Sequence, residues 1–231
     1  YHMKLKALFK KIIRFRKPDY DISDDYNFVE TLRFFNITSI IRGFVITFLK
    51  GKPRLCSIGK STNFVSYKNI NLFHFVKIGN NTKISSMGIN TSILIEKGVS
   101  IGAFCKLEVS SSIRRTGRFI KLRKNVGMGD YCQIGGYGGV EISENTIMGS
   151  YVSFHPLNHD FKHNPEIPIR QKGVLGKGIF IGKSCWLGAK STILDGVILG
   201  DNCVVAAGAV VTKSFPNNSI IGGVPAKILK K

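Results

Sequence analysis

The segment IFIGKSCWLGAKSTILDGVILGD, residues 179–201, decides the fold of this chain. An apolar residue stands at every sixth position of the segment, and the series continues past its end as Ile181, Leu187, Ile193, Leu199, Val205 and Val211. An α-helix repeats every 3.6 residues and a β-strand every two, so neither element keeps a period of six. A coil of short strands does, with one six-residue unit on each side of a triangle. The period therefore predicts an all-β solenoid, a parallel β-helix.

The same period extends through the earlier part of the chain. Its apolar positions are Ile58, Phe64 and Ile70; Leu72, Ile78 and Ile84; Ile95, Ile101, Leu107 and Ile113; Leu122, Met128, Ile134 and Val140; and Ile142, Met148 and Phe154. Four residues after an apolar position the side chain is usually small or β-branched, and Cys105, Cys132, Cys185 and Cys203 stand at this second position. We therefore expect these thiols to fill the core and not to act as metal ligands or nucleophiles.

The chain has 231 residues and a formal net charge of +20. Such a charge attracts anions, whether nucleic acid, an anionic membrane or a polyphosphate cofactor. No nucleic-acid-binding motif is present, so we expect no nucleic acid partner. No apolar run approaches the about 20 residues of a transmembrane helix, and the cysteines show no paired spacing. These features together predict a cytoplasmic protein.

From Leu55 to its C-terminus the chain resembles the hexapeptide-repeat acyltransferases. The resemblance is most specific in NHDF (158–161), PIR (168–170), VVAAGAVVTK (204–213) and IIGGVPAKI (220–228), beside the opening segment. Within the family it is similar to the sugar O-acetyltransferases, above all those that modify capsular and other surface polysaccharides. The resemblance implies a left-handed parallel β-helix, acetyl-CoA as acyl donor, a sugar hydroxyl as acceptor, and a homotrimer with active sites between subunits.

The predicted organisation has three parts. Residues 1–54 form a basic, helical N-terminal extension, residues 55–215 form the β-helix with a catalytic loop at 155–178, and residues 216–231 form a C-terminal cap. Within the extension, the segment Lys4–Lys17 alternates basic and apolar residues, which predicts an amphipathic helix. This helix either covers the open first coil or makes a peripheral contact with an anionic membrane, and the two roles are compatible.

The period fails between Phe154 and Ile181, where FHPLNHDFKHNPEIPIRQKG (154–173) holds three of the five histidines. A loop on a rigid scaffold often carries chemistry, and histidine serves as a general base near neutral pH. Asn158-His159-Asp160-Phe161 matches the pattern of the polysaccharide branch, so His159 is the favoured base. His155-Pro156 matches the maltose and galactoside branch, so His155 is the alternative. Asn158 and Asp160 are expected at the substrate, and His163 only as an accessory group.

The resemblance also implies a donor site and an acceptor contact. The residues expected at coenzyme A are Ala189, Ala207, Gly208, Thr212, Lys213, Pro225 and Lys227. Trp186 is expected to point outward and to line the channel of the acceptor and acyl donor, with packing beneath the loop as the alternative. A second interruption at 116–118 lies in a basic patch with Arg114, Arg115, Lys121, Arg123 and Lys124. A solvated face, an anionic acceptor and a subunit contact all remain open for this patch.

Three other functions are compatible with the fold. N-acylation of a nucleotide-linked amino sugar needs the same kind of base. A gamma-type carbonic anhydrase shares the β-helix but needs three histidine ligands around zinc, and the histidines here lack that spacing, so no metal is expected. A non-catalytic β-helix scaffold is the third alternative.

Overall fold

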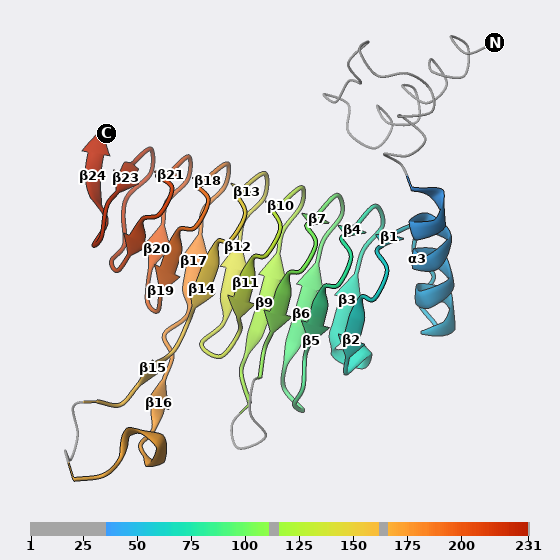
Figure 1. Cartoon of the computed structure of the whole chain (residues 1–231), viewed down its shortest axis with the longest axis horizontal. Helices are drawn as coiled ribbons and strands as arrows, with labels where there is room; N and C mark the ends of the chain where they lie inside the picture. Colours follow the sequence, from blue (N-terminus) through green and yellow to red (C-terminus); the bar gives the residue numbers. More distant parts are fainter. Residues whose placement is uncertain (1–35, 111–115, 162–165, 231) are drawn as a thin grey trace.

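The computed structural model describes residues 36–110, 116–161 and 166–230. The predicted helix within 4–17, the apolar position Ile113, the basic residues Arg114 and Arg115, and His163 lie outside the described residues. The described chain is a coil of short parallel strands in three sheets, with a helix at its N-terminal end and a loop that projects near its C-terminal end (Figure 1). This architecture confirms the predicted parallel β-helix.

Each turn of the coil passes through sheets A, B and C in that order. Sheet A contains β1 (Ser57–Ile58), β4 (Lys77–Ile78), β7 (Ser100–Ile101), β10 (Gly127–Met128), β13 (Ile147–Met148), β18 (Trp186–Leu187), β21 (Val204–Val205), β23 (Ile220–Gly222) and β24 (Lys227–Lys230). Sheet B contains β2 (Asn63–Val65), β5 (Lys83–Ser85), β8 (Lys106–Glu108), β11 (Gln133–Gly135), β14 (Ser153–His155), β19 (Thr192–Leu194) and β22 (Val210–Val211). Sheet C contains β3 (Ile70–Leu72), β6 (Ser92–Ile95), β9 (Phe119–Leu122), β12 (Val140–Ile142), β17 (Ile179–Ile181) and β20 (Ile198–Leu199).

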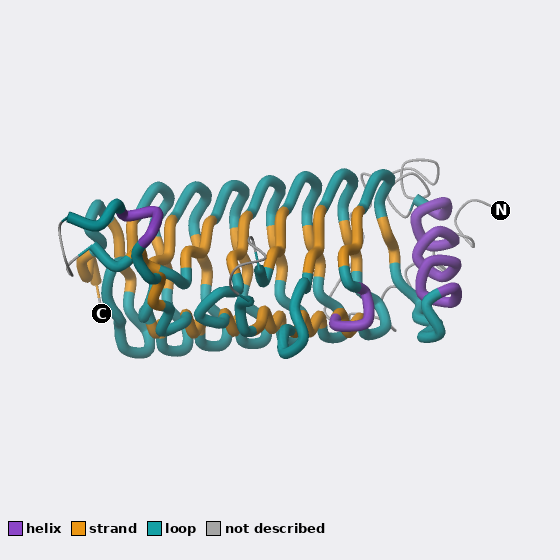
Figure 2. Tube along the Cα trace, turned by 90° about the horizontal axis from the view of Figure 1, so that it is seen from below, coloured by secondary structure: helices purple, strands orange, loops and turns teal. Residues whose placement is uncertain are grey.

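The strands stack in register along the coil axis (Figure 2). In sheet A this stacking places one buried apolar residue above the next: Ile58, Ile78, Ile101, Met128, Met148, Leu187, Val205 and Ile221. Cys105, Cys132, Cys185 and Cys203 are buried in the core, as the second position of the repeat predicts, and Cys56 is buried there as well. The parallel coil continues through β23, past residue 215, and β24 ends sheet A as its antiparallel edge.

Two corners of the coil turn sharply through left-handed backbone at non-glycine residues. At the corner between sheets A and B, Phe104, Tyr131 and Tyr151 have φ of 56°, 59° and 63°. Their rings stack face to face with centroids 4.9 and 4.8 Å apart. Such φ values are costly for bulky residues, and each stacked pair offsets part of that cost by about 0.5–1.5 kcal/mol. At the corner between sheets C and A the turn residue is often asparagine, which tolerates this backbone. There the side-chain amide of Asn125 donates a hydrogen bond to the side-chain oxygen of Asn145 at 3.1 Å.

The third corner, between sheets B and C, takes up every change in the length of a turn. Six residues separate Ile147 from Ser153 and Trp186 from Thr192, and this step from sheet A to sheet B is the same along the coil. The step from sheet C to sheet A is likewise constant at five residues, as from Ile181 to Trp186. The step from sheet B to sheet C is 5 residues from Leu194 to Leu199 but 26 from His155 to Ile181. Long insertions therefore leave the coil along one edge only.

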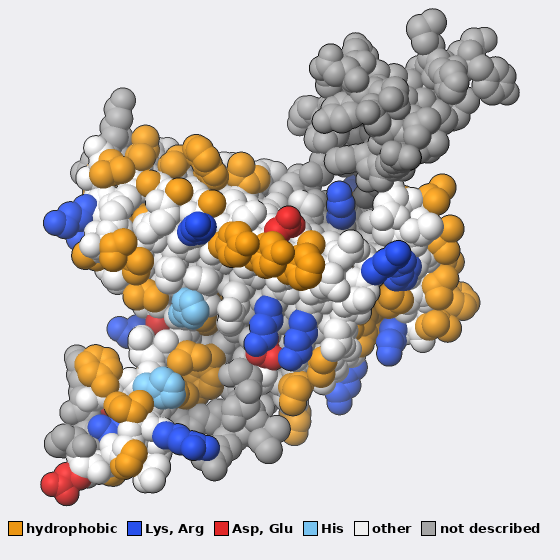
Figure 3. Space-filling view, in the orientation of Figure 1, with side chains coloured by type: hydrophobic (Ala, Val, Ile, Leu, Met, Phe, Trp, Pro, Cys, Tyr) orange, Lys and Arg blue, Asp and Glu red, His pale blue; other side chains and the backbone are white. Residues whose placement is uncertain are grey.

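Helix α3 (Ile37–Leu49) covers the first turn of the coil. The guanidinium of Arg42 donates to the carbonyl of Ile58 at 2.8 Å, and the hydroxyls of Ser39 and Ser57 are 2.6 Å apart. Gly43 is required at the contact because a Cβ there would collide with the carbonyl oxygen of Cys56. The outer face of α3 exposes hydrophobic side chains, seen in orange along the helix in Figure 3. In the described part of the chain, no helix has the length and apolar character needed to span a bilayer.

Candidate active site

Residues 156–161 and 166–178 leave the coil between β14 and β17, at the corner between sheets B and C (Figure 1). Their two legs form a short antiparallel ribbon, β15 (Asn158–His159) with β16 (Val174–Leu175), in which His159 lies opposite Val174. The backbone N–H of Asp160 donates to the carbonyl of Gly173 at 2.9 Å and extends the ribbon. The ribbon thus fixes the backbone of Asn158, His159 and Asp160, and leaves the side chains of Asn158 and His159 exposed. Beyond it, the loop contains the 3₁₀ turn η2 (Ile169–Gln171).

Asp195 holds the base of this loop, a role that the sequence analysis missed. Its carboxylate accepts hydrogen bonds from the backbone N–H groups of Lys177 and Gly178, both at 2.8 Å, and from the side-chain amide of Asn158 at 3.3 Å. Asp195 belongs to the next turn of the coil, at the same corner. It therefore ties both legs of the loop to the rigid scaffold. The pair Asp195-Gly196 was a signal for a turn, but not for this contact.

His155, the alternative base, lies on the coil and not on the ribbon. It is the last residue of β14, it points outward, and it lies opposite Leu194 of the neighbouring strand. The next residue, Pro156, begins the loop, and its carbonyl accepts a hydrogen bond from the N–H of Gly138 at 2.9 Å. The structure thus brings both candidate bases to the same corner, His155 at the foot of the loop and His159 on its stem.

Trp186 projects from sheet A, as the sequence predicts, and is 55 % exposed. It lies between Ile147 and Val204 in register, and Ile220 follows Val204 in an outward apolar row. Sheet A is the side of the triangle opposite the corner that carries His159. Among the described residues of a single chain, Trp186 therefore lies away from the loop and does not pack beneath it.

The residues expected at coenzyme A divide into two groups. Ala189, Ala207 and Gly208 are exposed at the corner between sheets A and B, where the N–H of Gly208 donates to the carbonyl of Ala189 at 2.9 Å. The space around this corner is open, because a Cβ built on Gly208 meets nothing within 4 Å. Pro225 follows a cis peptide bond and lies in the turn beside β22. Lys227 is the first residue of β24. Both lie at the end of the same corner.

Thr212 and Lys213 form the second group. They follow β22 at the other edge of sheet B, and both are exposed. The ammonium of Lys213 lies 5.8 Å from the centre of the Phe215 ring. The small residues of the first group thus leave room for an extended ligand, while this cation stands one strand away from them.

Across the described residues, no group of three or more histidine, cysteine or acidic side chains is placed so that it could hold a metal ion.

Comparison with known proteins agrees with this geometry. Residues 178–213 match the model of the hexapeptide repeat of succinyl-transferase, which supports the left-handed form of the coil. A putative lipopolysaccharide biosynthesis O-acetyl transferase, WbbJ, of Escherichia coli K12 is 40% identical over 113 residues, which are 46% of this chain and 58% of that protein. The galactoside O-acetyltransferase of Escherichia coli K12 is 32% identical over 96 residues, 40% of this chain and 44% of that protein. The chain therefore spans about half the length of the curated relatives it matches.

Among solved structures, a hexapeptide-repeat acetyltransferase of Vibrio cholerae in complex with acetyl coenzyme A is 26% identical. The match covers 48% of this chain and 59% of that one, with a TM-score of 0.44. The period of six and the three-sided coil agree with the match of residues 178–213 to the hexapeptide-repeat model, and the chain is similar in sequence to proteins named as O-acetyltransferases.

Proposed function

We propose that the chain is an acetyl-CoA-dependent O-acetyltransferase that acts on a sugar hydroxyl in the biosynthesis of a surface or capsular polysaccharide. The observation that carries the proposal is His159, which is exposed on a ribbon anchored by Asp195. The coil that carries this ribbon is similar to proteins named as a putative lipopolysaccharide biosynthesis O-acetyl transferase and a galactoside O-acetyltransferase.

His159 accepts the proton of the sugar hydroxyl as the hydroxyl oxygen attacks the thioester carbonyl, and the sulfur of coenzyme A leaves. A positioned general base contributes about 10²–10⁴-fold to such a step. The anchored ribbon supports this role, because a base must be held within hydrogen-bond distance of the proton it removes. The buried cysteines support direct transfer, since none of them is exposed to form a covalent acyl intermediate.

The acting form in this proposal is a homotrimer with composite active sites. In one chain, His159 lies at the corner between sheets B and C, while Trp186 and the open edge at Ala207 and Gly208 lie on sheet A and at the corner between sheets A and B. Acyl transfer needs base, acceptor and donor in one place. A neighbouring copy that presents its donor edge to the histidine loop brings these parts together.

Substitution of the two candidate bases, His159 and His155, tests the function. We expect His159→Ala to lower acetyl transfer from acetyl-CoA to the sugar acceptor by about 10²–10⁴-fold, with coenzyme A affinity nearly unchanged. His155→Ala, the matched control at the foot of the same loop, should retain most of the activity. Full activity in His159→Ala with loss in His155→Ala would move the base to His155, and full activity in both would refute catalysis by this loop.

The peripheral membrane contact through residues 4–17 and the cytoplasmic location stay predictions. Co-sedimentation with anionic vesicles at low but not at high salt tests the contact.

A further inference from the structure

A groove of about 400 Å³ lies on the outer face of sheet C, beside the base of the histidine loop. Its floor is a row of outward side chains on three neighbouring strands, because Glu141 lies opposite Phe180 and Phe180 opposite Ile198. Phe180 is 41 % exposed and Ile198 is 56 % exposed. Its volume falls within the range of small-molecule sites, about 300–1,000 Å³.

The edge of the groove toward the corner between sheets B and C consists of glycines. Gly138, Gly139, Gly178 and Gly196 all line it. At Gly139 the backbone has φ of 92°, and an added Cβ would lie 2.8 Å from the ring of Phe119, which also lines the groove. Gly139 therefore lets the Phe119 ring lie close to the corner. Gly138 and Gly139 end the glycine-rich run at 135–139, and they form part of this edge.

The net charge of the groove lining is positive. Arg118 and Lys177 are exposed in the lining, and Lys177 belongs to the base of the histidine loop. The guanidinium of Arg118 donates to the carbonyl of Gly138 at 3.4 Å, which uses one of its five N–H donors. Arg118 also lies 5.9 Å from the centre of the Phe119 ring. The groove therefore offers a positive charge, that of Arg118, beside an aromatic ring, that of Phe119.

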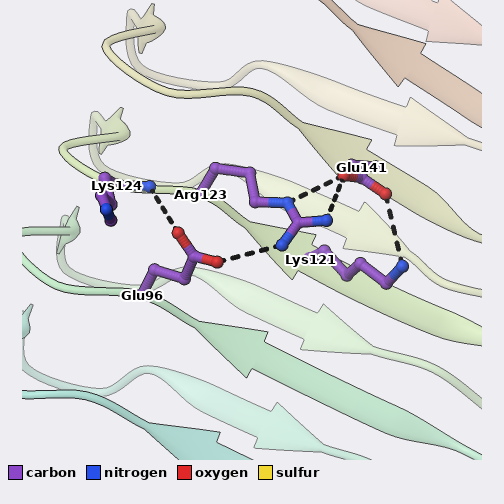
Figure 4. Close-up of polar contacts among 5 residues, drawn as sticks. All are labelled: Glu96, Lys121, Arg123, Lys124 and Glu141. Atoms are coloured by element: carbon purple, nitrogen blue, oxygen red, sulfur yellow. Dashed lines mark hydrogen bonds and ion pairs between the residues drawn. The ribbon is translucent and has the colours of Figure 1, made fainter.

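The acidic residue of the lining, Glu141, is already neutralised by neighbouring cations (Figure 4). Its Oε1 accepts from Arg123 at 2.8 and 2.6 Å, and its Oε2 accepts from Lys121 at 3.4 Å. Arg123 also pairs with Glu96 at 3.0 Å, so the network joins three turns of the coil and fixes the Glu141 carboxylate in place. An anion in the groove therefore meets Arg118 and Lys177 without an opposing unpaired carboxylate from Glu141.

We propose that this groove binds an anionic sugar, with its charged group between Arg118 and Lys177 and the apolar face of its ring on Phe180 or Phe119. The inference rests on the proposed acetyltransferase function and specifies its acceptor as a sugar that carries a carboxylate or a phosphate. The position of the groove supports this role: Lys177 is two residues from β16, the strand that pairs with Asn158 and His159. A charged sugar held here leaves its hydroxyls beside the loop that carries the base.

Titration calorimetry of the full chain at low salt tests the groove. The probes are tetragalacturonate, its fully methyl-esterified neutral form, and UDP-glucose. We expect at least one anionic probe to bind about tenfold more tightly than the neutral one, and this preference to weaken with salt. The double substitution Arg118→Gln with Lys177→Gln should remove most of the preference, while Lys60→Gln, an exposed lysine at another corner, should keep it. Tetragalacturonate alone would identify a carboxylate as the recognised group, and UDP-glucose alone a phosphate.

Equal binding of charged and neutral probes, no binding of either anion, or an unchanged preference in the double variant would overturn the inference. So would a change of oligomeric mass on Phe180→Ser, because the groove would then be filled by a second copy of the chain. Coenzyme A binding by the wild-type protein and its acetyl transfer are measured separately. Their failure would refute the proposed function even if the groove selects anions.

Discussion

The thiol of Cys185 lies inside the coil, where burial raises its pKa to about 11. Its ordinary pKa is 9.0, so the unfolded chain loses this proton at lower pH than the folded chain does. Below about pH 9 the thiol is protonated in both states. As the pH rises from about 9 to about 11, the unfolded state gains stability from ionisation, and the free energy of unfolding decreases.

We therefore expect the wild-type protein to lose about 2 kcal/mol more of its unfolding free energy than Cys185→Ser over this window, at 1.36 kcal/mol per pKa unit. Urea unfolding at several pH values measures the difference, and the titration of lysines and tyrosines cancels between the two proteins. Parallel pH profiles would contradict the burial effect. Resistance of the native thiols to alkylation at pH 8, lost on unfolding, provides an independent control.

At the scale of residues, the repeat could predict which side chains point inward, since the period of six fixes their phase. Cys185 and Trp186 are neighbours in sequence, and the structure buries the first and exposes the second as expected. The role of Asp195 could not be predicted in this way. Its hydrogen-bond partners lie 17, 18 and 37 residues earlier in the chain, and only the return of a loop of unknown length to the corner brings them together.

The histidine loop is the element on which the proposed chemistry depends, and Asp195 is its anchor. We expect Asp195→Ala to loosen the base of the loop, because hydrogen bonds to a charged acceptor contribute about 1.5–3 kcal/mol each. Hydrogen exchange at the amides of Lys177 and Gly178 should accelerate, and acetyl transfer should fall by about tenfold or more, while the coil stays folded.

Asp201→Ala is the matched control for this prediction. The carboxylate of Asp201 accepts from the N–H of Lys183 at 2.7 Å in the same way, but at a corner without a long loop. This variant should lose less stability, because the Asp201 carboxylate accepts one such hydrogen bond and Asp195 accepts three, and it should keep its activity. Normal activity of Asp195→Ala, or an equal loss of activity in Asp195→Ala and Asp201→Ala, would show that the anchor does not position the base.

At the scale of elements, the sequence could predict the coil because each strand repeats the same short pattern. It could also predict where the coil is interrupted, since the pattern stops at Phe154. The ribbon of β15 and β16 was beyond that argument. Each of its strands has two residues, too few to show a period, and their pairing depends on the anchor in the next turn. The groove on sheet C was missed for a related reason, because its lining comes from segments 118–119, 138–141, 177–180 and 196–198.

For the whole molecule, the central question is whether one chain contains a complete site. Ala207→Trp should block the donor edge without disturbing the coil, since Ala207 is exposed, and His159→Ala removes the base from the other corner. Each variant alone should be nearly inactive. Trimers that contain both variants, purified through two different tags after co-expression, should recover about a third of wild-type activity, because one of three directed interfaces joins two intact halves.

The recovery distinguishes the two arrangements of the site. A site contained within one chain would give no recovery in the mixed trimers, because every chain carries one damaged half. A monomeric mass of the active protein in solution would refute the trimer. Coenzyme A binding, lost in Ala207→Trp and kept in His159→Ala, verifies that each substitution damages only its own half.

At the variable corner between sheets B and C, the length of a loop can change without changing the fold of the coil. Two edges keep a fixed count of residues, so any length change there would shift every following pair of strands out of register. The third edge already tolerates steps of 5 and 26 residues, and longer closed loops add entropy cost only slowly.

Eight added Gly and Ser residues after Ile89, which is 93 % exposed in a turn at this edge, should leave the melting temperature within a few degrees. The same insertion after Lys60, at the corner between sheets A and B, should prevent cooperative folding. A lineage could therefore exchange acceptor specificity, one loop at a time, without ever rebuilding the core.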